Sequence, residues 1–153
     1  MRAVIQRVNQ ASVAVDNKIV GKIGQGLVVL LGVAHDDLED DAAYLAHKIC
    51  DMRIFEDTGG KMNLSLRDVA GEVLAISQFT LYANTRKGRR PSFIEAAPPE
   101  AANSLYEYFI QCIKRENIMV SAGVFGAMML IRIDNYGPVT IILNSEDRFK
   151  PRN

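Results

Sequence analysis

The sequence predicts a single α+β domain in which a mostly antiparallel, barrel-like β-sheet is covered by two helices. Three observations predict this class. Strand-like segments, about nine of them, far outnumber the two helical stretches. Several of these segments follow one another through short turns of the kind found in hairpins. The chain of 153 residues suits one domain, residues 1–153, with room for a sizeable core.

The N-terminal part of the chain supplies the first strands. Apolar and polar side chains alternate there with a period of two, and turns containing Gly, Asn or Asp separate the segments. The last segment is apolar throughout, so we expect a central strand that is buried on both faces. The predicted strands are, in order, residues 2–8, 11–15, 19–23 and 27–33.

Two stretches have the periodicity of amphipathic helices. The first follows Asp36 and Asp37, either of which can cap its N-terminus, and the second, residues 100–116, follows a pair of prolines. Each helix is expected to cover the sheet, with Cys50 and Cys112 as buried free thiols. The apolar stripes are Leu38, Ala42, Leu45, Ala46, Ile49 and Cys50 in the first helix, and Ala102, Leu105, Tyr106, Phe109, Cys112 and Ile113 in the second.

The remaining strands lie between and after the helices. The longest, residues 72–81, places Ser77 and Phe79 on one face and Gln78 and Thr80 on the other if the strand period holds throughout. The other predicted strands are residues 52–55, 117–121, 128–133 and 139–143, with a polar loop at 56–63 and a polar tail at 144–153.

Charge and hydropathy narrow the class of protein. Lys plus Arg and Asp plus Glu number 18 each, so the net charge is zero, and hydrophobic residues make up 48% of the chain. These values are typical of a globular protein, not of a disordered or membrane protein. The first residues do not have the apolar core of a signal peptide, and no run is long enough to cross a bilayer. We therefore expect a cytoplasmic protein with no membrane partner.

One basic run stands out against this neutral background. Arg86, Lys87, Arg89 and Arg90 fall within five residues, with a tyrosine before them and Phe93 after them. Because clustered cations bind phosphates and exposed aromatic rings stack on bases, the run favours contact with a polyanion. The alternative is an ordinary solvated loop.

Several other chemistries are disfavoured. His35 and His47 are the only histidines, and neither has a carboxylate or a cysteine beside it at the spacing of metal ligands or of a Ser-His-Asp triad. The run Gly59-Gly60-Lys61 lacks the spacing of a phosphate-binding loop. We therefore predict no metal, no cofactor and no nucleotide hydrolysis.

Two short motifs stand at the ends of apolar, strand-like segments, where sites are commonly built. One is residues 77–81. The other is residues 135–140, in which Gly137 has no Cβ and Pro138 has a fixed φ and no N–H. The pair predicts a rigid turn whose backbone another molecule can approach closely, although Asn, Gly and Pro are also the commonest residues of plain turns.

Together, these and seven other motifs resemble the D-aminoacyl-tRNA deacylase family, in order and over nearly the whole chain. Tyr136 departs from the family pattern, which has an acidic residue there, and this changes the flank of the turn but not the Gly137-Pro138 pair. The motifs are Arg7-Val8, Ala11-Ser12-Val13, Gly26-Leu27, Arg53-Ile54-Phe55-Glu56-Asp57, Gly60-Lys61-Met62-Asn63, Ser77-Gln78-Phe79-Thr80-Leu81, Gly88-Arg89-Arg90-Pro91-Ser92-Phe93, Phe125-Gly126-Ala127 and Gly137-Pro138-Val139-Thr140.

The resemblance implies a homodimeric enzyme that hydrolyses the ester between a D-amino acid, or glycine, and the terminal ribose of tRNA. It implies a cis Gly137-Pro138 peptide that enters the partner subunit's site, faces residues 77–80, holds the amino group and excludes an L side chain. A binding wall made of backbone atoms would reject L-amino acids by their shape, whatever their side chain is. The implied residues are Ser77, Gln78, Phe79 and Thr80 for catalysis, Gly137 and Pro138 for chiral selection, Phe125 and Met129 near the terminal adenosine, and Arg86, Lys87, Arg89 and Arg90 for tRNA binding.

Two chemistries are compatible with these residues. The Thr80 hydroxyl could act as a nucleophile, but its motif holds no histidine, lysine or carboxylate to activate it. We favour the alternative, in which the backbone amides of Phe79 and Thr80 stabilise the oxyanion and the 2′-hydroxyl of the RNA assists. Two other functions stay open: a non-catalytic module that binds RNA or another partner, and a related editing fold such as the proofreading domain attached to some archaeal threonyl-tRNA synthetases.

Overall fold

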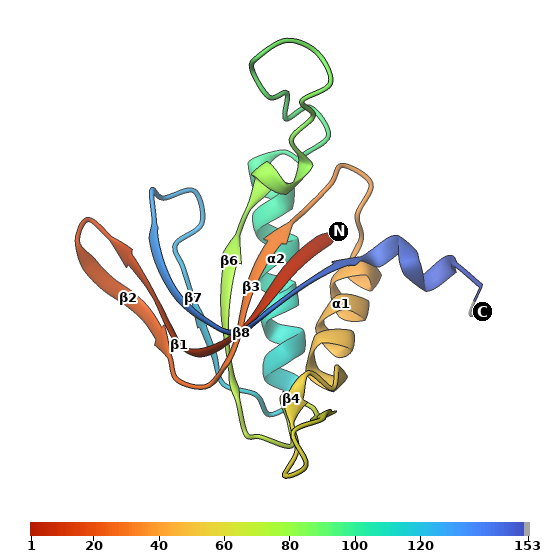
Figure 1. The fold of residues 1–153 in the computed structure, drawn as a ribbon. Helices are drawn as coiled ribbons and strands as arrows, with labels where there is room; N and C mark the ends of the chain where they lie inside the picture. The colour runs from red at the N-terminus through yellow and green to blue at the C-terminus, as the bar shows by residue number, and fades with distance from the viewer. Residues whose placement is uncertain (152–153) are drawn as a thin grey trace.

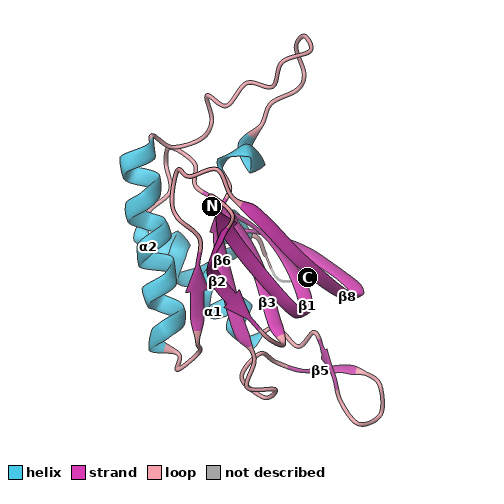
Figure 2. Cartoon of the chain, turned by 90° about the vertical axis from the view of Figure 1, so that its left-hand side faces the viewer, coloured by secondary structure: helices cyan, strands magenta, loops and turns pink. Residues whose placement is uncertain are grey.

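The computed structural model describes residues 1–151 and consists of one curved sheet with two helices on the same side of it (Figures 1 and 2). Two short 3₁₀ helices, Phe79–Tyr82 and Ser145–Phe149, follow β6 and β8. The strands are β1 (Arg2–Val15), β2 (Lys18–Ile23), β3 (Gly26–Gly32), β4 (Phe55–Glu56), β5 (Met62–Leu64), β6 (Glu72–Ser77), β7 (Val120–Ala122) and β8 (Leu130–Asn144), and the α-helices are α1 (Glu39–Asp51) and α2 (Pro99–Arg115).

The predicted α+β class is confirmed. The main sheet has the order β2-β1-β3-β6-β7, and β8 pairs with β1. β1 is antiparallel to β2, β3 and β8, whereas β3 and β6, and β6 and β7, are parallel. The parallel pairs arise because each is joined by a crossover that contains a helix, α1 in one case and α2 in the other.

The sheet curls until it is nearly a closed barrel. Where β2 approaches β7, the Ser121 hydroxyl donates a hydrogen bond to the Lys22 carbonyl at 3.1 Å. The inside of the curl is filled by a small apolar cluster, and a larger cluster lies between the sheet and the two helices. Leu45 and Ile49 of α1 and Phe109 and Ile113 of α2 are fully buried in the larger cluster, as their predicted stripes require.

Several predicted boundaries are wrong. Residues 2–8 and 11–15 form one strand, because β8 pairs with both parts and shifts of register absorb the break between them. Likewise, residues 130–133 of the strand predicted at 128–133 and all of 139–143 belong to the single strand β8. The strand predicted for 72–81 ends at Ser77, and the alternation expected for Gln78 to Leu81 gives way to a 3₁₀ helix.

The other differences are local. The strand predicted at 52–55 is reduced to Phe55–Glu56, and α1 begins at Glu39 after Leu38, so neither Asp36 nor Asp37 is its cap. The carboxylate of Asp41 accepts the Leu38 amide at 2.9 Å instead. Part of the predicted polar tail folds as the second 3₁₀ helix, and residues 152–153 lie outside the described residues.

Both cysteines are free thiols, with Cys50 buried and Cys112 half-buried. Burial raises the pKa of the Cys50 thiol to about 12. Within residues 1–151, no helix is long and apolar enough to cross a membrane.

We predict that Gly26→Ala will lower the free energy of unfolding by about 3 kcal/mol or more. Gly26 pairs with β6 so closely that an added Cβ would lie 1.9 Å from the Glu72 carbonyl oxygen, a backbone atom. Denaturant unfolding at matched protein concentrations measures the effect. Gly24→Ala is the control, because its Cβ would meet only the Glu72 carboxylate at 3.6 Å. Equal unfolding midpoints for the two variants would contradict the prediction.

Candidate active site

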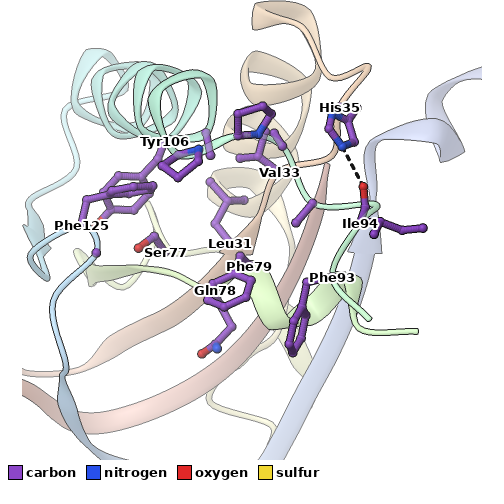
Figure 3. A pocket seen from close by; sticks show the side chains of 16 residues that line it. Leu31, Val33, His35, Ser77, Gln78, Phe79, Phe93, Ile94, Tyr106 and Phe125 are labelled. Atoms are coloured by element: carbon purple, nitrogen blue, oxygen red, sulfur yellow. Dashed lines mark hydrogen bonds between the residues drawn. The ribbon is translucent and has the colours of Figure 1, made fainter. Parts of the chain in front are cut away.

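An apolar cavity of about 640 Å³ opens beside the ends of β3 and β6 and the N-terminal turn of α2 (Figure 3). Leu31 and Val33 contribute from β3 and the residues after it, and Ser77 from the end of β6. Phe125, from the connection between β7 and β8, closes one side. The volume falls within the range of small-molecule sites, roughly 300–1,000 Å³.

The 3₁₀ helix that follows β6 forms the polar edge of this cavity. The Gln78 amide donates to the Leu31 carbonyl at 2.8 Å, and the Leu81 amide donates to the Gln78 carbonyl at 3.2 Å. Gly32 allows the turn to pack directly on β3, because a Cβ there would lie 3.1 Å from both the Gln78 carbonyl oxygen and Leu81 Cβ. Phe79 and Thr80 begin the helix, and the first amides of a helix have no partner within it.

The side chains of Gln78 and Thr80 meet. The Gln78 Nε2 group donates to Thr80 Oγ1, so the hydroxyl oxygen is an acceptor in this contact. An amide cannot remove a proton. Among residues 1–151, no histidine, lysine or carboxylate is hydrogen-bonded to this hydroxyl, which therefore has no base beside it.

Two aromatic residues, Tyr106 and Phe125, line the cavity on the side away from this 3₁₀ helix. The Tyr106 hydroxyl donates to the Ala75 carbonyl at 2.8 Å and ties α2 to β6. Burial raises the pKa of Tyr106 to about 12, so this donor stays protonated at neutral pH. The half-buried Phe125 ring packs against it, with the two ring centres 6.1 Å apart. Tyr106, predicted to face the core, is therefore also a wall of the cavity.

The Gly137-Pro138 segment is a bulge inside a strand, not a terminal turn. Gln6 pairs with Thr140 and Val8 with Asn135, so that residues 136–139 of β8 lie opposite one residue of β1. The Gly137-Pro138 peptide bond is cis, and Gly137 has φ +130°, a value that favours glycine. Both residues are exposed. We call residues 136–139 the Gly-Pro bulge.

Arg7, the residue opposite the Gly-Pro bulge, is buried beneath it with only 4% of its surface exposed. Its Nε donates to the Tyr136 carbonyl at 3.0 Å and its Nη1 to the Ile54 carbonyl at 2.7 Å. The guanidinium also lies over the Tyr136 ring, 5.2 Å from its centre, and Nη2 is 3.9 Å from a Glu56 carboxylate oxygen. Arg7 thus fixes the bulge from below.

The two motifs are not brought together within one chain. Arg2, the first residue of β1, donates to the Leu81 carbonyl, and Arg7, near the middle of the strand, contacts the Gly-Pro bulge. These two arginines are five residues apart along the strand, about 17 Å. Of the two residues expected near the terminal adenosine, Phe125 lines the cavity, whereas Met129 packs in the small cluster inside the barrel.

The four cations lie in an exposed loop that follows β6 and projects from the rest of the fold (Figure 1). Asn84 and Ser92 exchange two backbone hydrogen bonds of 2.8 and 2.9 Å and close its base. We call residues 85–91 the basic loop. Within residues 1–151, none of its four cations forms a salt bridge with a carboxylate. Phe93, directly after the loop, packs edge-to-face on Phe79.

Sequence reasoning assigned no role to some residues of this region. Arg7 belongs to one of the motifs that resemble the family, but nothing local marks it as the support of the Gly-Pro bulge. His35 lines the cavity, where its Nε2 is 2.7 Å from the Ile94 carbonyl oxygen, although histidine chemistry was not expected. Only the folded chain brings His35 to residues far along the sequence.

Comparison with known proteins gives consistent matches. A family model described as D-Tyr-tRNA(Tyr) deacylase matches residues 4–144. A D-aminoacyl-tRNA deacylase from Dehalococcoides mccartyi is 60% identical over 152 residues, 99% of each chain. Another from Thermus aquaticus is 56% identical over 153 residues, which cover 100% of this chain and 99% of the relative.

Solved structures share the fold. The structure of a protein called c-Myc DNA unwinding element binding protein superposes with a TM-score of 0.88 and 40% identity, covering 94% of this chain and 98% of that one. A probable eukaryotic D-amino acid tRNA deacylase has the same fold at a TM-score of 0.81 and 19% identity, with the same coverage. With the family model spanning most of the chain and relatives this similar, the chain belongs to the D-aminoacyl-tRNA deacylase family.

Proposed function

We propose that this chain hydrolyses the ester between a D-amino acid, or glycine, and the terminal ribose of tRNA. It acts as a homodimer, and each site combines residues 77–80 of one subunit with Gly137 and Pro138 of the other. The observation that carries the proposal is the position of these two segments beside β1, where Arg2 contacts the residues after β6 and Arg7 contacts the Gly-Pro bulge.

A two-fold axis would unite the segments. By the strand period, Thr140 and Ile142 point to the same face of β8, and Ile142 is 62% exposed there although it is apolar. Ile142 pairs with Val4, which lies about midway between Arg2 and Arg7. A second copy rotated about an axis near this pair would cover Ile142 and bring each Gly-Pro bulge to the other subunit's residues 77–80.

In such a dimer, the backbone of the Gly-Pro bulge selects the chirality of the substrate's amino acid. Gly137 has no side chain, Pro138 has a fixed φ, and Arg7 holds the carbonyl of the preceding residue. Such a wall accepts a hydrogen on one side of the α-carbon and excludes a larger group. Because it reads shape at the α-carbon alone, it rejects L-amino acids whatever their side chain and accepts glycine.

The backbone amides of Phe79 and Thr80 are the proposed oxyanion donors. They begin the 3₁₀ helix at the cavity edge, and each such donor is worth roughly 3 to 4 kcal/mol of transition-state stabilisation. The 2′-hydroxyl of the terminal ribose assists. The Thr80 hydroxyl is not the nucleophile in this proposal, since its only hydrogen-bonding partner among residues 1–151 is the Gln78 amide.

We predict that Thr80→Ala and Thr80→Val will keep turnover within about tenfold of the unmodified enzyme, because backbone donors do not depend on this side chain. Single-turnover hydrolysis of D-tyrosyl-tRNA measures the effect. Abolished turnover with unchanged tRNA binding would restore the Thr80 hydroxyl as the nucleophile.

The basic loop is proposed to contact tRNA phosphates. We expect the logarithm of the tRNA affinity to fall linearly as the logarithm of salt concentration rises. Replacing Arg86, Lys87, Arg89 and Arg90 by glutamine should flatten this slope by roughly 0.7–0.9 for each phosphate that the loop no longer binds. Filter binding over a salt series gives both slopes. A slope unchanged by the substitutions would mean that the loop does not bind phosphate.

The function itself is tested with matched esters. A catalytic amount of the protein should hydrolyse D-tyrosyl-tRNA and leave L-tyrosyl-tRNA intact. Hydrolysis of both esters would remove the chiral filter from the proposal. If tRNA binds but neither ester is cleaved, the chain is an RNA-binding module instead of an enzyme.

A further inference from the structure

We propose that Phe93 forms a stacking site for the nucleotide that precedes the terminal adenosine in the unpaired 3′ end of tRNA. The basic loop holds the phosphates that follow. This inference deepens the proposed function and rests on it. It assigns a role to an aromatic residue and a loop that neither the ester chemistry nor the chiral selection uses.

The first observation is an exposed aromatic pair at the mouth of the cavity (Figure 3). The rings of Phe79 and Phe93 lie edge-to-face with their centres 5.0 Å apart and their planes at 72°. Phe79 is 56% exposed and Phe93 37%, and neither belongs to the buried clusters. In this arrangement the edge of one ring meets a face of the other, so at least one face of Phe93 is not covered by Phe79 and can receive a flat partner.

The second observation is the charge beside this pair. Phe93 directly follows the hydrogen bonds that close the basic loop, and the tip of the loop extends about three residues per arm beyond them, ~10 Å. The nearby Glu95 carboxylate is 3.4 Å from the side-chain amide of Asn84. A strand that leaves the cavity would therefore pass the ring first and the four cations next.

These features suit a single strand. A base must be unstacked before an aromatic side chain can cover it, and bases within a duplex are not available in this way. The 3′ end of a tRNA, cytidine-cytidine-adenosine, is unpaired. With the adenosine at the cavity, the cytidine before it is the base that would reach Phe93.

The test compares two minimal substrates, the D-tyrosyl ester of adenosine and the D-tyrosyl ester of the trinucleotide cytidine-cytidine-adenosine. We expect Phe93→Ala to lower the ratio of their kcat/KM values, trinucleotide over adenosine, by about tenfold. Phe93→Tyr should restore the ratio because it keeps the ring, whereas Phe93→Leu should not. Phe149→Ala is the matched control, since Phe149 is another exposed ring beside an arginine but is not near the cavity.

Binding of the uncharged trinucleotide gives an independent readout. Its affinity should fall about tenfold with Phe93→Ala, and to the same extent in unmodified protein when the middle nucleotide is made abasic. The inference is overturned if Phe93→Ala changes neither the ratio of kcat/KM values nor the trinucleotide affinity. It is also overturned if Phe93→Ala lowers kcat/KM equally for both esters, because Phe93 would then only support Phe79. If unmodified protein cleaves neither minimal ester, trinucleotide binding alone decides the role of Phe93, and hydrolysis of D-tyrosyl-tRNA decides the proposed function separately.

Discussion

Replacing Phe79 by proline is expected to slow the hydrolysis of D-tyrosyl-tRNA by about 10²–10³-fold, because it deletes one of the two proposed oxyanion donors. The backbone tolerates the change. Phe79 is the first residue of its 3₁₀ helix, where proline fits, and Gln78 before it has φ −144° and ψ 78°, outside the helical region that proline disfavours.

The matched control is Phe79→Ala, which removes the same ring but keeps the amide N–H. We expect this variant to lose tenfold or less in single-turnover rate, because only the aromatic ring at the mouth of the cavity is removed. Equal losses in the two variants would show that the ring matters and the amide does not. Unfolding midpoints of both variants identify any loss that comes from misfolding.

The sequence predicts this fold well where the local pattern and the tertiary environment agree. The stripe that includes Leu45 and Ile49 predicts α1, and the continuous apolar run at 27–33 predicts the buried strand β3. The helix faces the larger cluster, and β3 lies between both clusters, so each segment has the apolar pattern that its surroundings require. The class and the two covering helices follow from such segments.

The prediction fails where long-range contacts override the local pattern. Alternation predicts a strand through Leu81, but packing against Gly32 turns the chain into a 3₁₀ helix after Ser77. The residues from Asn135 to Thr140 are typical of a turn, yet pairing on both sides with β1 keeps the segment within one strand. Neither Gly32 nor β1 is close to these segments in the sequence, so no local signal could report them.

The residues of the candidate site also fall into two groups, those that the sequence could identify and those that it could not. The motif residues could be named from the sequence, and their resemblance to a family supplied the implied roles. Arg7 could not be identified as a support, because its two carbonyl partners lie 129 and 47 residues away. The shared dimeric site stays a prediction, and Arg7, which holds the Gly-Pro bulge, is the residue on which to test it.

Arg7→Met is expected to reduce kcat/KM for D-tyrosyl-tRNA by about 100-fold, because the Gly-Pro bulge loses the donor that fixes it and a displacement of about 1 Å is enough for such a loss. Methionine fills a similar space but leaves the Tyr136 and Ile54 carbonyls without this donor, at a cost of about 1–3 kcal/mol of stability. Thermal unfolding checks that the variant is folded. Arg53→Met, an exposed substitution, is the control.

Mixing variants tests whether the bulge held by Arg7 acts in the partner's site. In a mixed dimer of Arg7→Met and Phe79→Pro subunits, one site combines intact residues 77–80 from the first with an intact Gly-Pro bulge from the second. Random exchange makes half of the dimers mixed with one intact site each, so activity should recover to about a quarter of the unmodified value. If each site is built within one chain, every site in the mixture carries a defect and no activity returns.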